Sequence, residues 1–223
     1  TLDLNTTGSS NTAVGSGSLG SSTTASQNTA VGRVALNANT TGTANVAVGY
    51  QALENNTTAS YNTAVGANAA DALTTGAQNT VVGYNAFTSA TGAAYSVALG
   101  YRSLLNATTS SYNTAVGYDS MKDTTTGANN TALGGRSLQS CTTGSSNVAI
   151  GDYALTTQTT TSNNTAVGTQ ALRYNTTGTQ NTAVGYLALD ANTTGQQNNA
   201  FGDNALGANT TGSYNVAVGE QSL

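Results

Sequence analysis

Few residues of this chain could do chemistry, and they are widely spaced. Histidine is absent, and the nine acidic residues are scattered among Asn, Thr, Ser and Gly. General acid–base catalysis needs titratable groups within hydrogen-bond reach of the reacting atoms. The best candidate pair is Asp203 and Glu220, which lie 17 residues apart, although two solvated surface carboxylates are the simpler interpretation. Calcium-binding β-rolls repeat aspartates in register in a glycine-rich turn, and no turn here carries them. We therefore expect no enzyme activity, no cofactor and no structural metal.

Two sets of tyrosines are better candidates for a binding surface. Tyr84, Tyr101 and Tyr118 follow one another at intervals of 17 residues, and so do Tyr95 and Tyr112. Aromatic ladders on a polar surface can stack on sugar rings or contact a partner. They can equally stack on one another and stabilise the fold. The sequence leaves both interpretations open.

Asn-x-Thr triplets, the acceptor pattern for N-glycosylation, recur along the chain and are typical of surface turns in secreted proteins. The candidate sites are Asn5, Asn39, Asn56, Asn106, Asn175, Asn192 and Asn209. Most of them open an Asn-Thr-Thr-Gly sequence, and a turn alone would explain that sequence. Two hypotheses explain the triplets. One is glycosylation, on these asparagines or on the abundant threonines, and the other is a purely structural turn.

A strict 17-residue repeat must position all of these residues. We number each unit from the first residue of a block that reads Asn-Thr-Ala-Val-Gly in its clearest copies. Units start at 11, 28, 45, 62, 79, 96, 113, 130, 147, 164, 181, 198 and 215, with no insertion. Such a register is typical of a stacked solenoid. It predicts one continuous array over residues 1–223, which we interpret as a segment of a longer fibre because the repeat runs unaltered into both ends.

The columns of the repeat indicate β-structure. Positions 2 to 4 alternate in the manner of an extended segment, while Gly at position 5 and the Asn-Thr-Thr-Gly at positions 12 to 15 supply turns. Gly, Asn and Thr fill too many positions for a helix. The sequence predicts an all-β fold, a parallel β-solenoid or β-roll of about thirteen coils with two short strands in each. Where position 9 has Ala70 in place of Leu, we expect Leu73 to fill the coil interior from the other side.

Composition narrows the possible partners. Only 6% of residues are charged, the net charge is -4, and no basic run occurs, so we expect neither nucleic acid nor an anionic membrane surface as a partner. No apolar run approaches the roughly 20 residues that span a bilayer, so we expect no membrane insertion. The lone Cys141 excludes an intramolecular disulfide and is interpreted as a small, half-buried residue.

A single coil has too few large apolar groups to be stable alone. One Val and one Leu contribute roughly 1.5–3 kcal/mol each on burial, against backbone ordering that costs about 1–2 kcal/mol for each residue. The small Ala at position 3 would suit close approach of a second surface. We therefore expect the chain to associate with itself, as a homotrimer or a head-to-tail filament.

The repeat resembles two groups of known proteins. The block Asn147-Val148-Ala149-Ile150-Gly151 is similar to the head repeat of trimeric autotransporter adhesins. The longer unit, with Ala-Leu and Asn-Thr-Thr-Gly, resembles repeats of phage and virus tail fibres and of bacterial surface fibres. The resemblance implies a left-handed parallel β-roll, three chains side by side, that projects from a surface and binds a host or matrix.

These observations favour a structural and adhesive segment of an extracellular fibre, on a cell or a virion, with itself, glycans or a host surface as partners. Glycan binding and ice binding by a β-solenoid are the alternatives. Ice binding would need a flat face of Thr-x-Thr in register, whereas the paired turn threonines Thr40 and Thr41 are adjacent and would point opposite ways if extended.

Overall fold

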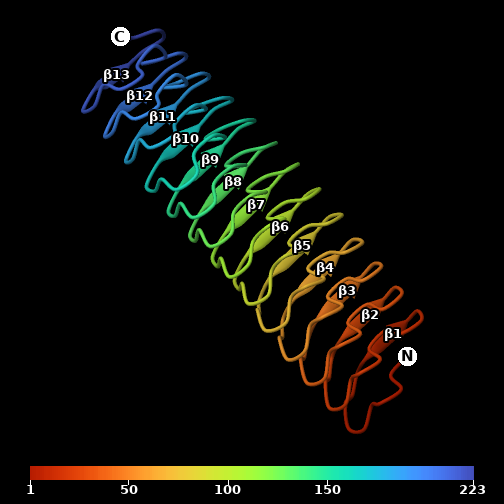
Figure 1. The fold of residues 1–223 in the computed structure, drawn as a ribbon. Coiled ribbons are helices and arrows are strands. Elements are labelled where there is room, and N and C mark those ends of the chain that lie inside the picture. Colours follow the sequence, from red (N-terminus) through yellow and green to blue (C-terminus); the bar gives the residue numbers. More distant parts are fainter. The chain divides into compact units, whose positions relative to one another are not determined.

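The computed structural model describes all residues 1–223 as an all-β parallel solenoid without helices (Figure 1). The chain forms two compact units, residues 1–112 and 113–223. Unit 1 contains β1 (Thr12–Val14), β2 (Thr29–Val31), β3 (Val46–Val48), β4 (Thr63–Val65), β5 (Thr80–Val82) and β6 (Val97–Leu99). Unit 2 contains β7 (Thr114–Val116), β8 (Thr131–Leu133), β9 (Val148–Ile150), β10 (Thr165–Val167), β11 (Thr182–Val184), β12 (Asn199–Phe201) and β13 (Val216–Val218). Whether the array is continuous over both units, and its handedness, stay predictions.

Within each unit, every strand pairs in parallel with the next strand of the chain, in strict register. Thr12 pairs with Thr29 and Ala13 with Ala30 at one end of unit 1, and Thr182 pairs with Asn199 in unit 2. Each repeat position therefore stacks on the same position of its neighbour. The 17-residue period read from the sequence is the length of one coil.

Alanine at position 3 lies inside the coils, whereas the sequence suggested that it would face a second surface. Alanine at position 3 is fully buried, as Ala47 and Ala183 show, while the residues at positions 2 and 4 of the same strands face outward and are half-buried or exposed. The expectation that the alanine column meets a second chain was therefore wrong. The physical reason is that leucine at position 9 and asparagine at positions 1 and 12 share the coil interior with position 3, which accepts Ala or, at Val81, one larger side chain.

Each coil has one strand, not the two expected. Beyond the strand, positions 7, 9 and 17 adopt left-handed conformations, as in Leu187 (φ 54°), Leu189 (φ 52°) and Gln197 (φ 55°). A residue in this region cannot continue an extended segment. Backbone bonds between coils nevertheless persist here, for example Leu172 N–H to Ala188 O at 3.0 Å. The second strand was predicted from turn residues alone, and those signals do not reveal isolated left-handed residues.

Leucine at position 9 occupies a backbone region that costs about 1–2 kcal/mol for a residue with a side chain. Leu53, Leu155 and Leu189 all adopt it, and each side chain is fully buried. Burial of a leucine contributes roughly 1.5–3 kcal/mol, which is enough to offset the conformational cost. The prediction for the variant coil is confirmed, because Ala70 and Leu73 are both fully buried.

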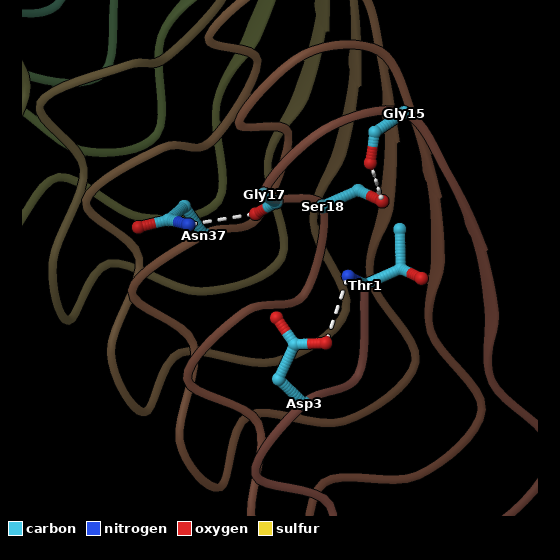
Figure 2. A network of polar contacts seen from close by, with 6 residues as sticks. All are labelled: Thr1, Asp3, Gly15, Gly17, Ser18 and Asn37. Atoms are coloured by element: carbon cyan, nitrogen blue, oxygen red, sulfur yellow. Dashed lines mark hydrogen bonds and ion pairs between the residues drawn. The ribbon is translucent and has the colours of Figure 1, made fainter.

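Polar bonds within and between coils hold the turns. Figure 2 shows three of them in the first coils of unit 1. Ser18 Oγ donates to Gly15 O at 2.9 Å within one turn, and Asn37 Nδ2 donates to Gly17 O of the preceding coil at 2.6 Å. The N-terminal amine of Thr1 donates to Asp3 Oδ1 at 3.2 Å. The Ser18 hydroxyl thus joins the Ser18 N–H on the Gly15 carbonyl, and the Asn37 amide supplies a donor to the Gly17 carbonyl.

The asparagine at position 1 forms a ladder of buried amides. Asn45 Nδ2 donates to Ala59 O at 2.8 Å, and Asn45 Oδ1 accepts the N–H of Asn62 in the next coil at 2.9 Å. Asn62 repeats the same pattern toward Asn79. The asparagine column therefore links coil to coil, which agrees with its interpretation as stacked amides.

Candidate functional site

Neither unit contains a pocket, and no group of three or more His, Cys, Asp or Glu side chains could hold a metal ion. No helix is long and apolar enough to cross a membrane. Asp203 and Glu220, the candidate carboxylate pair, are both exposed. The features that distinguish the molecule chemically are therefore rows of side chains on the outside of the coils.

The first such row is the strand face, which we define as the outward residues at positions 2 and 4. Position 2 is mostly Thr or Val, and position 4 is always a large apolar residue. Several side chains at position 4 are exposed: Val14, Val65, Val82, Leu133, Phe201 and Val218. All charged residues of the chain lie at positions 6, 7, 10 and 11, so the strand face is uncharged along both units.

A threonine rank lies elsewhere on each coil. At position 13 the threonine hydroxyl bonds to the next coil, as Thr40 Oγ1 donates to Thr57 O at 3.1 Å. The neighbouring threonine at position 14, such as Thr41, Thr143 or Thr211, is exposed. Thr40 is half-buried and Thr41 is exposed, whereas Thr210 and Thr211 are both exposed. The strand face is not Thr-x-Thr, because position 4 is apolar throughout.

The tyrosine ladders of unit 1 stack on themselves. The rings of Tyr84 and Tyr101 lie 5.8 Å apart at an interplanar angle of 14°, and those of Tyr95 and Tyr112 lie 4.9 Å apart at 6°. All four side chains are exposed. A sugar ring stacks on the face of an aromatic ring, and within a stack the inner faces are already covered. This geometry favours the stabilising role, and glycan binding stays a hypothesis.

Tyr118, the third member of the first tyrosine set, lies in unit 2 and belongs to a ladder that alternates arginine with tyrosine. The Arg136 guanidinium lies 5.6 Å from the Tyr118 ring centroid and 5.3 Å from that of Tyr153. The Arg173 guanidinium lies 5.2 Å from the Tyr153 ring and 4.9 Å from that of Tyr174. The hydrogen bond to Tyr118 raises the pKa of Arg136 above its ordinary value. This ladder was not predicted, although the placement of Arg136 and Tyr153 at position 7 of successive coils was a usable signal.

The candidate glycosylation sites fall into two groups. Asn39, Asn56, Asn175 and Asn192 have fully buried side chains, and each Nδ2 donates to the backbone carbonyl three residues later, for example Asn175 to Gly178 at 2.8 Å. Their interpretation as surface asparagines was wrong, because position 12 points into the coil. Asn5 is exposed and Asn106 and Asn209 are half-buried, so modification there stays a hypothesis.

Cys141 occupies the same inward position 12 and is fully buried, more deeply than the half-buried site expected. Burial raises the pKa of its thiol to about 11. Since the thiolate is the nucleophilic form, Cys141 is unsuited to catalysis. Its side chain packs in the coil interior.

Comparison of the chain with protein-family models, with curated proteins and with solved structures found no match. The functional conclusion therefore depends on the fold and on the surface rows just described.

Proposed function

We propose that this chain is a structural and adhesive segment of an extracellular fibre, built from copies of the chain that associate side by side. The observation that carries the proposal is the strand face, an uncharged row with an apolar residue in every coil. Contiguous exposed apolar surface on a soluble protein marks an interaction site. The resemblance to adhesin heads favours three copies.

A second copy of this chain fits the strand face better than an unrelated partner. Both surfaces would carry the same ridges at the spacing of neighbouring strands, about 4.8 Å, so their side chains could interdigitate over many coils. No charge on either surface would be desolvated without compensation. A closed ring of copies would also cover the row completely.

The turns outside the strand face would supply the adhesive contacts. Every charged side chain lies at positions 6, 7, 10 or 11, and most tyrosines lie at positions 6 and 17, with different residues from coil to coil. A regular scaffold with variable turns is a common way to present binding groups. Glycans or a host surface are the partners that such exposed aromatic and polar residues would contact.

Charge placed on the strand face tests the proposal. Leu133→Lys with Phe201→Lys puts two ammonium groups on this face, and Thr143→Lys with Thr211→Lys puts two on position 14 of the same coils. We expect the unaltered chain and the threonine variant to sediment as trimers and the strand-face variant as a folded monomer. Circular dichroism checks that all three are folded. Equal association of the two variants, or an unaltered chain that stays monomeric at high concentration, would overturn the proposal.

Ice binding is a second candidate, favoured by the exposed threonine rank at position 14. A rank at the regular spacing of parallel strands would offer an ordered array of methyl and hydroxyl groups. Thermal hysteresis measured on the unaltered chain and on the Thr143→Lys, Thr211→Lys variant separates the two functions. Ice binding requires activity in the first that falls in the second, while a fibre segment shows none in either.

A further inference from the structure

Tyr95 and Tyr112 form the tighter of the two tyrosine stacks of unit 1. Both residues occupy position 17 of consecutive coils and share a left-handed backbone, with φ of 57° and 60°. The N–H of Tyr112 donates to Ala94 O at 3.1 Å, which ties the two coils together beside the rings. The rings lie 4.9 Å apart, nearly parallel, and their exposed fractions are 50% and 58%. Two phenols are thus held in contact at a site open to solvent.

The electrostatic surroundings separate this pair from the other tyrosine contacts. The Arg102 guanidinium lies 4.8 Å from the ring of Tyr101, and cations lie over Tyr50, Tyr118, Tyr153 and Tyr174 in the same way. A cation over a ring withdraws electron density and makes removal of an electron harder. The charged residues lie at positions 6, 7, 10 and 11, whereas Tyr95 and Tyr112 lie at position 17, and neither ring lies under a guanidinium.

The stack also lies where the polar ladders between coils are interrupted. In the coils that contain these tyrosines, position 12 is Ala90 and Ala107, so neither coil has the buried amide found at Asn39 or Asn192. Position 1 of the second coil is Ser96, whose hydroxyl donates to Ala94 O within its own turn at 3.1 Å. A link between these two coils would therefore reinforce a place that lacks the buried amide at position 12.

We propose that Tyr95 and Tyr112 are an oxidative cross-linking site that joins consecutive coils through a dityrosine bond. Each phenol loses one electron and one proton to a one-electron oxidant, such as hydrogen peroxide acting through a haem peroxidase. The two phenoxyl radicals couple through the ring carbons next to the hydroxyl groups, and tautomerisation restores both aromatic rings. One new C–C bond forms, and two protons and two electrons reduce one hydrogen peroxide to two waters. Rotation of an exposed ring about its Cα–Cβ bond brings the coupling carbons together.

The cross-link closes a short loop of one coil, so it restricts the unfolded chain as a disulfide of similar span does. The stacked geometry within one chain is sufficient for the reaction, and association through the strand face is not required. The cross-link is tested by the joined peptide and the proposed assembly by sedimentation, so failure of one does not imply failure of the other.

The positions of arginine and lysine make the test direct. Trypsin cleaves after Arg102 and Lys122, which places Tyr95 in peptide 34–102 and Tyr112 in peptide 103–122. After treatment with horseradish-type peroxidase and hydrogen peroxide, we expect these two peptides as one species, lighter than their sum by two hydrogen atoms. A mixture of isotope-labelled and unlabelled chains should give joined peptides of one label only. The treated chain should melt about 4 °C higher or more.

Two single variants test the assignment of the bond to Tyr112. Tyr112→Phe keeps a stackable ring without a phenol and should abolish the joined species and the rise in melting temperature. Tyr118→Phe removes the other tyrosine of peptide 103–122 and should leave both unchanged. Circular dichroism confirms that both variants are folded before oxidation. The proposal is overturned if the joined species survives in Tyr112→Phe, disappears in Tyr118→Phe, contains mixed labels, or fails to form in the unaltered chain.

Discussion

Position 5 of each coil imposes two structural requirements, and only glycine meets both. Its φ lies between 123° and 143°, a region that residues with a side chain rarely adopt. A Cβ on Gly117 would also overlap the carbonyl oxygen of Gly134 in the next coil, and the same contact recurs along each unit. The invariant column of the repeat therefore follows from the close stacking of backbones.

Substitution of this glycine should damage the fold more than substitution of its neighbour. We expect Gly117→Val to lower the free energy of unfolding by about 3 kcal/mol or more, since backbone strain and a backbone clash add. Gly135 is not restricted to a positive φ, and a Cβ there meets the end of the flexible Asp152 side chain. Gly135→Val should have a much smaller effect. Equal melting temperatures would refute the turn assignment.

The Asp71 carboxyl should make stability depend on pH. Burial raises the pKa of Asp71, a hydrogen bond from the Ala72 backbone partly opposes this, and the Glu54 carboxylate raises it further. The charged form is thus disfavoured in the folded chain. The contribution of Asp71 to stability is greatest at low pH and is lost as pH rises through its folded pKa.

We therefore expect Asp71→Asn to raise the melting temperature at pH 7 and to have little effect near pH 4, close to the ordinary carboxyl pKa. Asp203→Asn, at an exposed carboxylate, is the control and should change little at either pH. Scanning calorimetry at both pH values measures the difference. An Asp71→Asn variant that is less stable than the unaltered chain at pH 7 would contradict the expected direction.

At the scale of the coil, the interior is filled mainly by one large side chain, which can come from more than one position of the repeat. Leu73 replaces the leucine missing at Ala70, and both are fully buried. Leu73→Ala should lower the free energy of unfolding by about 2–5 kcal/mol, because it removes apolar contacts and leaves a void. Leu4→Ala, at an exposed leucine, should be nearly neutral. Chemical denaturation of both variants gives the comparison, and similar midpoints would show that Leu73 does not fill the interior.

The coil also shows which features a sequence can reveal. The period, the parallel stacking and the inward role of Leu73 follow from spacing and residue size, and all were predictable. The inward direction of Ala47 was not, because alternation along a strand fixes two faces without saying which one is buried. The inward direction of Asn39 was not either, because Asn39 lies in a turn, and a turn sequence does not say which side chain points inward. The left-handed conformation of Leu189 escaped prediction because leucine rarely adopts it. The Arg136 ladder spans four coils, and of its members only Arg136 and Tyr153, at position 7 of successive coils, gave a signal in the sequence.

At the scale of the whole molecule, stability should be distributed over the coils. Deletion of residues 181–197 removes one complete coil and joins Gln180 to Asn198 in the register of all other junctions. We expect this variant to fold with a modest loss of stability, because repeat arrays behave as sums of neighbouring interfaces. Deletion of 181–189 breaks the register and should unfold the region around it. Hydrogen exchange distinguishes the two, and equal protection in both variants would contradict the expectation.

The direction of the backbone hydrogen bonds has a mechanical consequence. Within each unit these bonds run from coil to coil, as in Thr182 N–H to Asn198 O at 2.8 Å and Gly202 N–H to Val184 O at 2.8 Å. A force that pulls a unit along its stacking direction therefore acts on one coil interface at a time. Under tension the coils should detach singly, and each should release about 56–61 Å of extended chain, given 17 residues at 3.3–3.6 Å. Such a unit would extend in repeated small steps under load, and each step would dissipate part of the applied mechanical energy.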